Sequence, residues 1–197
     1  MKTSLNCLLA SVILGAASLG VAAPLASSAF FAAADSSSFV KTEPDERYKL
    51  YGAPSVILRL KNEDALGEID LSSDERPANV ILTLDDGMNV LSSSGGVIGS
   101  FADVFAQIYL AAIPVAEIKT QSVAEAFVSA YESNKISDIA VLSDNADVLS
   151  YVRGALPGIR GIYDCSAKPL TDKKEIVKTS GAAMATTLIL SCEQSDL

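Results

Sequence analysis

Acidic side chains are the groups of this chain that could do chemistry, because the sequence contains no histidine. The lack of histidine excludes serine and cysteine hydrolase triads, histidine-based acid–base catalysis and most zinc sites. No Walker-type lysine loop is present, and the glycines of GGVIGSF are not spaced as in a dinucleotide-binding turn. The sequence therefore leaves carboxylate catalysis, a carboxylate-bound Ca²⁺ or Mg²⁺, or no catalysis.

The candidate residues lie mostly at the ends of short apolar runs. They are Asp85 and Asp86, Glu117 and Lys119, Ser143 and Asp144, and the separate pair Glu68 and Asp70. If the runs are parallel strands, their carboxyl ends meet at one edge of the sheet, where the sites of α/β proteins gather. The Glu68-x-Asp70 spacing suits a metal-binding pair only if it lies on a strand, since otherwise it is typical of solvated surface.

Glu117 and Lys119 alternate along one run, so both side chains point to the same face of the expected strand. A buried glutamate must be ion-paired, protonated or metal-bound. Lys119 can neutralise Glu117, which gives a structural ion pair, while a metal ion would give a functional carboxylate. Both interpretations fit the sequence.

Ordinary local structure also accounts for the other candidates. Asp85-Asp86-Gly87 is common turn chemistry at the end of a strand. Ser143 and Asp144 directly precede a helix-like segment, where such residues cap helix N-termini. A catalytic role for these residues would require the fold to bring them together at one site.

The elements that must position these residues are six apolar runs and four helix-like segments. The runs are SVILRLK (55–61), NVILTLDD (79–86), IPVAEIK (113–119), DIAVLSDN (138–145), IRGIYDC (159–165) and TTLILSC (186–192). Helices are expected to begin after cap residues at Ser100, at Ser122, at Asn145 or Asp144, and near Thr171. Strand and helix therefore alternate along the chain.

This alternation predicts an α/β fold with parallel strands joined by right-handed crossovers. Two architectures fit: a partial TIM-type (βα) barrel, and an open doubly wound parallel sheet. A complete barrel takes roughly 200 residues or more, which is more than 55–197 supplies. The barrel interpretation therefore requires an incomplete barrel.

The N-terminus resembles a secretory signal, with Lys2 followed by an apolar run rich in small residues. We expect a signal peptide over 1–34, an exposed linker over 35–54 and the α/β domain over 55–197. Cleavage after Ala29 or after Ala34 fits the small-x-small rule, and Pro24 and nearby serines argue against a membrane anchor. The protein is therefore expected to be extracellular or at the cell surface, with no transmembrane span after signal removal.

The formal net charge of −9 argues against nucleic-acid binding and against an anionic membrane surface. Such an acidic chain can attract cations. Cys165 and Cys192 end two consecutive runs, and in an exported protein they are either a disulfide or two buried thiols. The sequence does not indicate an oligomeric state.

From Pro77 to Ser191 the chain resembles the glycerophosphodiester phosphodiesterase family and its phospholipase-C-like barrel relatives. The resemblance is carried by VILTLDDGMNVLSSSGGVIGSFADVF, IPVAEIK and DIAVLSDNADVLSYVRGALPGIRGIYD. It implies that Glu117 is the metal-ligand glutamate of the family's Glu-Ile-Lys strand. Glu68-Ile69-Asp70-Leu71 likewise looks like the family's Glu-Leu-Asp-Val metal pair.

The chain departs from this family at the catalytic histidines. The His-Arg-Gly motif, due near Leu58–Lys61, is absent, and Asp85 stands where the catalytic histidine aligns. The resemblance thus implies a partial, degenerate barrel whose catalysis is lost or reduced and which binds a phosphodiester or another small molecule. The alternatives are an active metal-dependent phosphodiester hydrolase with Asp85 as a substitute base, and an open-sheet protein that binds a small ligand.

Overall fold

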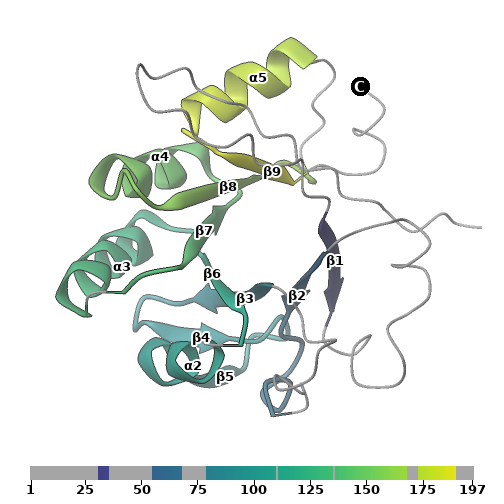
Figure 1. Ribbon diagram of the computed structural model, residues 1–197, viewed down its shortest axis with the longest axis vertical. Coiled ribbons are helices and arrows are strands. Elements are labelled where there is room, and N and C mark those ends of the chain that lie inside the picture. Colours follow the sequence, from purple (N-terminus) through teal and green to yellow (C-terminus); the bar gives the residue numbers. More distant parts are fainter. Residues whose placement is uncertain are drawn as a thin grey trace, which may run out of the picture.

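A computed structural model of the chain describes residues 31–35, 55–67, 79–109, 111–134, 136–167 and 173–189. Within these ranges the protein is a mixed α/β structure, in which a mostly parallel sheet is accompanied by four helices (Figure 1). In this described part, none of the helices combines the length and the apolar character needed to span a membrane.

The described strands form one sheet of nine strands. They are β1 (Phe31–Asp35), β2 (Ser55–Arg59), β3 (Asn79–Leu84), β4 (Asn89–Leu91), β5 (Val97–Ser100), β6 (Ile113–Glu117), β7 (Ala140–Ser143), β8 (Arg160–Asp164) and β9 (Thr187–Ile189). The helices are α2 (Phe101–Ile108), α3 (Gln121–Asn134), α4 (Ala146–Ala155) and α5 (Lys173–Ala182).

All six strands predicted from the apolar runs are confirmed, each a little shorter than its run. Two features were not predicted. Strand β1 crosses the expected boundary between signal peptide and linker, and it pairs in parallel with β2. Strands β4 and β5 form an antiparallel hairpin beside β3, outside the six predicted strands.

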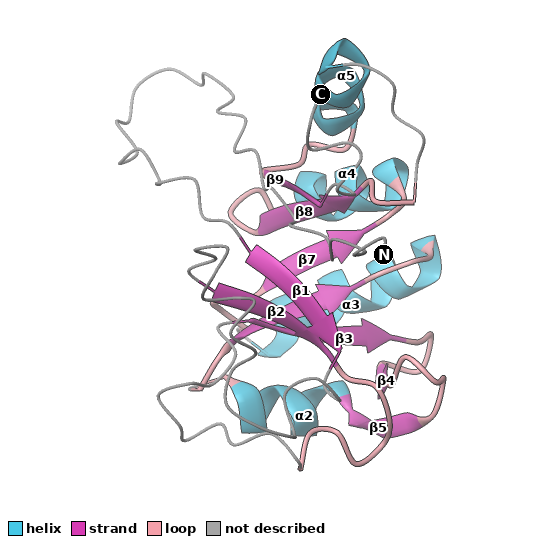
Figure 2. Cartoon of the chain, turned by 90° about the vertical axis from the view of Figure 1, so that its right-hand side faces the viewer, coloured by secondary structure: helices cyan, strands magenta, loops and turns pink. Residues whose placement is uncertain are grey.

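The parallel strands follow one another in chain order, β1-β2-β3-β6-β7-β8-β9. This order contains no reversal, which a doubly wound sheet needs at its switch point. The helices lie on one side of the sheet (Figure 1), and in the turned view β1 and β2 lie in front of α3 (Figure 2). The described sheet is not closed into a barrel, because β1 and β9 are its two ends.

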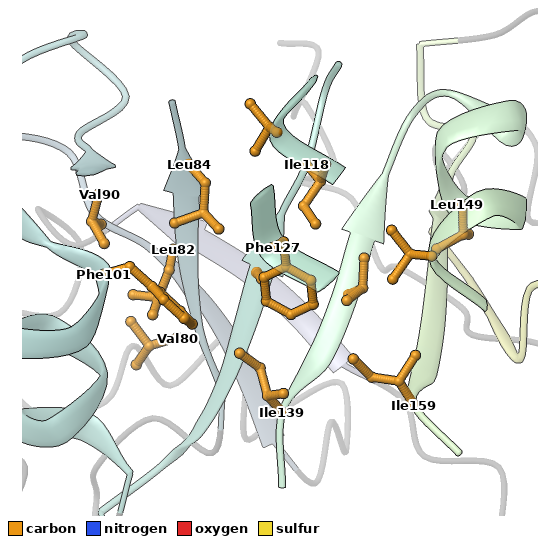
Figure 3. Packing of buried hydrophobic residues seen from close by; sticks show 14 of the residues in the cluster. Val80, Leu82, Leu84, Val90, Phe101, Ile118, Phe127, Ile139, Leu149 and Ile159 are labelled. Atoms are coloured by element: carbon orange, nitrogen blue, oxygen red, sulfur yellow. The ribbon is translucent and has the colours of Figure 1, made fainter. Parts of the chain in front are cut away.

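The main core fills the space between the sheet and the helices. Leu82 comes from β3, Ile118 directly follows β6, and Phe101, Phe127 and Leu149 come from the helices; Figure 3 shows these side chains packed between the two layers. Each large apolar side chain buried in this way stabilises the fold by about 1.5–3 kcal/mol.

The opposite face of the sheet carries a second apolar cluster. It consists of Ile57, Ile81, Val115, Ala140, Leu142 and Ile162. These residues alternate with those of the main core along each strand, so the strands are buried on both faces, as near-continuous apolar runs indicate.

Helix starts follow their predicted caps in two cases. Ser100 accepts a hydrogen bond from the Asp103 N–H at the start of α2, and Asn145 accepts one from Asp147 at the start of α4. The prediction for α3 was wrong: its cap is Thr120, whose Oγ1 accepts from the Val123 N–H at 3.4 Å, and the helix already includes Ser122. Thr171 lies outside the described residues.

Candidate functional site at Glu117

Three polar side chains meet on the face of the sheet opposite the described helices, near the carboxyl ends of three consecutive strands. Arg59 ends β2, Thr83 lies near the end of β3 and Glu117 ends β6. The register pairs Thr83 directly with Glu117. Arg59 pairs with Ile81, two residues before Thr83, so its long side chain lies on the same face and reaches along the sheet.

Glu117 is held by a two-pronged ion pair. The Arg59 guanidinium donates from Nη1 to Oε2 at 2.6 Å and from Nη2 to Oε1 at 2.9 Å. The Thr83 hydroxyl donates to the same Oε2 at 2.5 Å. The Lys119 ammonium lies farther off, 3.9 Å from Oε2, and more than half of its side chain is exposed.

The charges around Glu117 decide its protonation. Burial by itself raises the pKa of this carboxyl, since its side chain is only 8% exposed. The hydrogen bonds and charge of Arg59 outweigh burial, with smaller help from Thr83 and Lys119, so the pKa lies below its ordinary value. Glu117 is therefore an ionised carboxylate at neutral pH.

This arrangement limits what Glu117 can do. A carboxylate offers about four lone-pair directions, and Arg59 and Thr83 use three of them. A metal ion would have to approach a carboxylate whose charge Arg59 already neutralises. A carboxyl with a lowered pKa is also a weaker general base than an ordinary one. The described geometry is that of a structural ion pair.

The predicted ion pair between Lys119 and Glu117 is present, but it is the longer of the two ion pairs that Glu117 makes. Lys119 contributes, yet the close contacts come from Arg59, which lies 58 residues away in the chain. A signal was present in the sequence, because Arg59 interrupts an otherwise apolar run on the same face as Ile57. A basic residue in such a run requires an acidic partner.

Asp85 and Asp86 form the turn between β3 and β4. Asp85 Oδ1 accepts hydrogen bonds from the N–H groups of Asn89 at 2.8 Å and Gly87 at 2.9 Å. These bonds, led by that of the Asn89 backbone, lower the pKa of Asp85. The turn interpretation is confirmed, and a carboxyl held in this way is poorly suited to replace a catalytic histidine. Asp86 instead accepts from the Ser122 hydroxyl at 2.5 Å, which ties the turn to α3.

Of the other candidates, Ser143 and Asp144 are described, and they do not join Glu117 in one cluster of ligands. Ser143 is fully buried, and its Oγ accepts from the Asn145 N–H at 3.1 Å, while Asp144 is exposed at the same loop. Glu68 and Asp70 lie outside the described residues. Among the residues that are described, no three histidine, cysteine, aspartate or glutamate side chains are grouped to hold a metal ion.

Cys165 is buried just after β8, where its N–H donates to the Ile189 carbonyl of β9 at 2.9 Å. Cys192 lies outside the described residues, so a disulfide and two buried thiols both stay predictions.

No family model, no curated protein and no solved structure matches this chain.

Proposed function

We propose that this chain is a secreted, phosphodiesterase-like α/β domain, wound as an incomplete TIM-type barrel, that binds an anionic ligand without hydrolysing it. The ligand class is a small phosphodiester. Support for the winding comes from the sequential strand order and from the helices on one side of the sheet (Figure 1). In a TIM-type barrel, such strands end at the face that carries the site.

The observation that carries the proposal is the Arg59–Glu117 pair. The resemblance to the phosphodiesterase family implies that Glu117 takes the position of a metal ligand, but here Arg59 contacts both of its carboxylate oxygens. The chain also lacks the two histidines that serve as acid and base in the similar family. Asp85, the aligned substitute, is held in a turn with a lowered pKa. Together these features favour a domain that has lost catalysis.

The binding part of the proposal depends on the cations at this end of the sheet. Lys119 presents an ammonium to solvent beside the buried pair, and its contact with Glu117 is a long one of 3.9 Å. The Arg59 side chain, which is 29% exposed, adds a second positive charge at this end of the sheet. A phosphodiester oxygen is a suitable acceptor for both groups.

Hydrolysis and binding assays on the exported protein test the proposal together. We expect no turnover of bis(p-nitrophenyl) phosphate, with or without Ca²⁺ or Mg²⁺, and measurable binding of glycerophosphocholine by calorimetry. Lys119→Gln should weaken this binding several-fold. Lys178→Gln is the matched control, since Lys178 is an exposed lysine on α5.

Two results would contradict the proposal in different ways. Metal-dependent turnover that disappears in Glu117→Gln would identify an active hydrolase and remove the claim of lost catalysis. Absence of binding, or equal binding by the Lys119 and Lys178 variants, would remove the anion site.

A further inference from the structure

Strand β1 lies where the sequence leaves two signal cleavage sites open. It pairs with β2 in parallel along its whole length, from Phe31 opposite Ser55 to Asp35 opposite Arg59. Ala29, the end of the first small-x-small triplet, precedes this strand, whereas Ala34, the end of the second, lies within it.

We propose that signal peptidase cleaves after Ala29, so that the mature protein begins at Phe30 and retains β1 as an edge strand. This inference rests on the secretion included in the proposed function. It also moves the start of the folded domain from residue 55 to residue 31.

Loss of sheet pairing is the first argument against cleavage after Ala34. That cut removes every residue of β1 except Asp35. The N–H and C=O groups of β2 that now pair with β1 would lose their partners. Strand β2 would become the edge strand, and it carries Ile57 and Leu58 of the two apolar clusters.

Charge is the second argument. Cleavage after Ala34 would place the new α-ammonium group on Asp35, whose backbone lies opposite that of Arg59, about 5 Å away across the two strands, so a further positive charge is added at this end of β2. Arg59 already carries the positive charge that neutralises Glu117. Cleavage after Ala29 instead places the α-ammonium group on Phe30, at the N-terminal end of β1 and roughly 16 Å along the chain from Asp35. The Arg59–Glu117 pair is then undisturbed.

The direct test is the N-terminus of the exported protein. The full-length chain is expressed in a secreting host, and the secreted product is analysed by intact-mass spectrometry and N-terminal sequencing. A start at Phe30 is the expected result. A start at Asp35, or at any residue other than Phe30, overturns the assigned site. A chain that keeps Met1 overturns the secretion on which the inference rests.

The role of β1 is tested without the peptidase. Two recombinant chains, one beginning at Phe30 and one at Asp35, are compared by thermal denaturation. We expect the shorter chain to melt about 5 °C lower or more, or to fail to fold. Equal melting temperatures would show that β1 is not part of the folded domain.

A proline pair within the longer chain provides the matched control. Only alternate residues of a parallel strand donate their N–H to a given neighbour, and an edge strand tolerates proline where the N–H points outward. One of Ala32→Pro and Ala33→Pro should therefore lower the melting temperature by several degrees while the other leaves it nearly unchanged. Equal effects of the two variants would contradict the pairing of β1 with β2.

Discussion

Replacing Arg59 by methionine is the sharpest perturbation of the Glu117 site. The variant keeps most of the side-chain length but removes both guanidinium contacts, at 2.6 and 2.9 Å, from a carboxylate that is 8% exposed. Breaking a buried ion pair from one side costs about 3–5 kcal/mol. Because Arg59 itself is 29% exposed, we expect a loss near the lower figure, about 3 kcal/mol, in the free energy of unfolding.

Urea denaturation at pH 7 measures this loss, and a double-mutant cycle assigns it to the pair. Glu117→Gln in the Arg59→Met background should recover part of the stability, because no unpaired charge remains buried. Arg160→Met is the control, since Arg160 is exposed at the start of β8 and should change stability by less than about 0.5 kcal/mol. A loss below about 1 kcal/mol for Arg59→Met, or additive effects in the cycle, would show that the Arg59–Glu117 pair does not stabilise the fold in this way.

The same pair predicts a pH dependence with a definite sign. The pKa of Glu117 is lowered by folding, so its contribution is complete above the pKa of the unfolded chain and disappears as pH falls through the lower folded value. Without Arg59, only Thr83 and Lys119 oppose the effect of burial, so the pKa of Glu117 should rise and protonation at low pH should remove the unpaired charge that destabilises the variant. The stability difference between wild type and Arg59→Met should therefore narrow as pH falls from 7 to the acidic range; a constant difference would contradict the account.

Three further predictions concern other parts of the fold. Met184 follows α5 with φ +52°, in the left-handed region that favours glycine, and the next N–H, of Ala185, bonds to the Ser180 carbonyl. Met184→Gly should therefore raise the free energy of unfolding by about 0.5–1 kcal/mol in urea denaturation. A lower free energy of unfolding would contradict backbone strain at Met184. Arg153 donates hydrogen bonds to the backbone carbonyls of Met184, Pro157 and Ile159. Arg153→Met should lower the free energy of unfolding by about 2 kcal/mol in the same assay, and Arg153→Lys should lower it less. Equal losses for the two variants would rule out the forked contacts. Asp85→Ala should lower the melting temperature at pH 7, and the difference from wild type should shrink as pH falls through the lowered pKa of Asp85. A difference that persists in acid would show that the ionised Asp85 carboxylate does not stabilise the turn.

The sequence predicted the order of elements well because that order depends on local patterns. Near-continuous apolar runs identify strands covered on both faces, and Ser100 and Asn145 cap their helices through contacts within three residues. The cap of α3 was misplaced because Thr120 and Ser122 are both competent, and the choice depends on how α3 meets β6 and the Asp86 turn.

The candidate site was less accessible to sequence reasoning, because its partners are brought together by strand register. Arg59 and Glu117 lie on strands that are not neighbours, with β3 between them, and no local spacing reports their contact. Strand β1 was missed for another reason. Its residues Phe31–Ala34 are as apolar as the run before them, so composition alone assigns them to the signal peptide.

Carbon-13 NMR titration of the Glu117 carboxyl group distinguishes an ion-pair partner from a metal ligand. The resonance is assigned with Glu117→Gln and followed against pH with and without Ca²⁺ or Mg²⁺. The account predicts a pKa below the ordinary glutamate value that neither cation changes. A carboxyl shift that saturates with added Ca²⁺ or Mg²⁺ would contradict it.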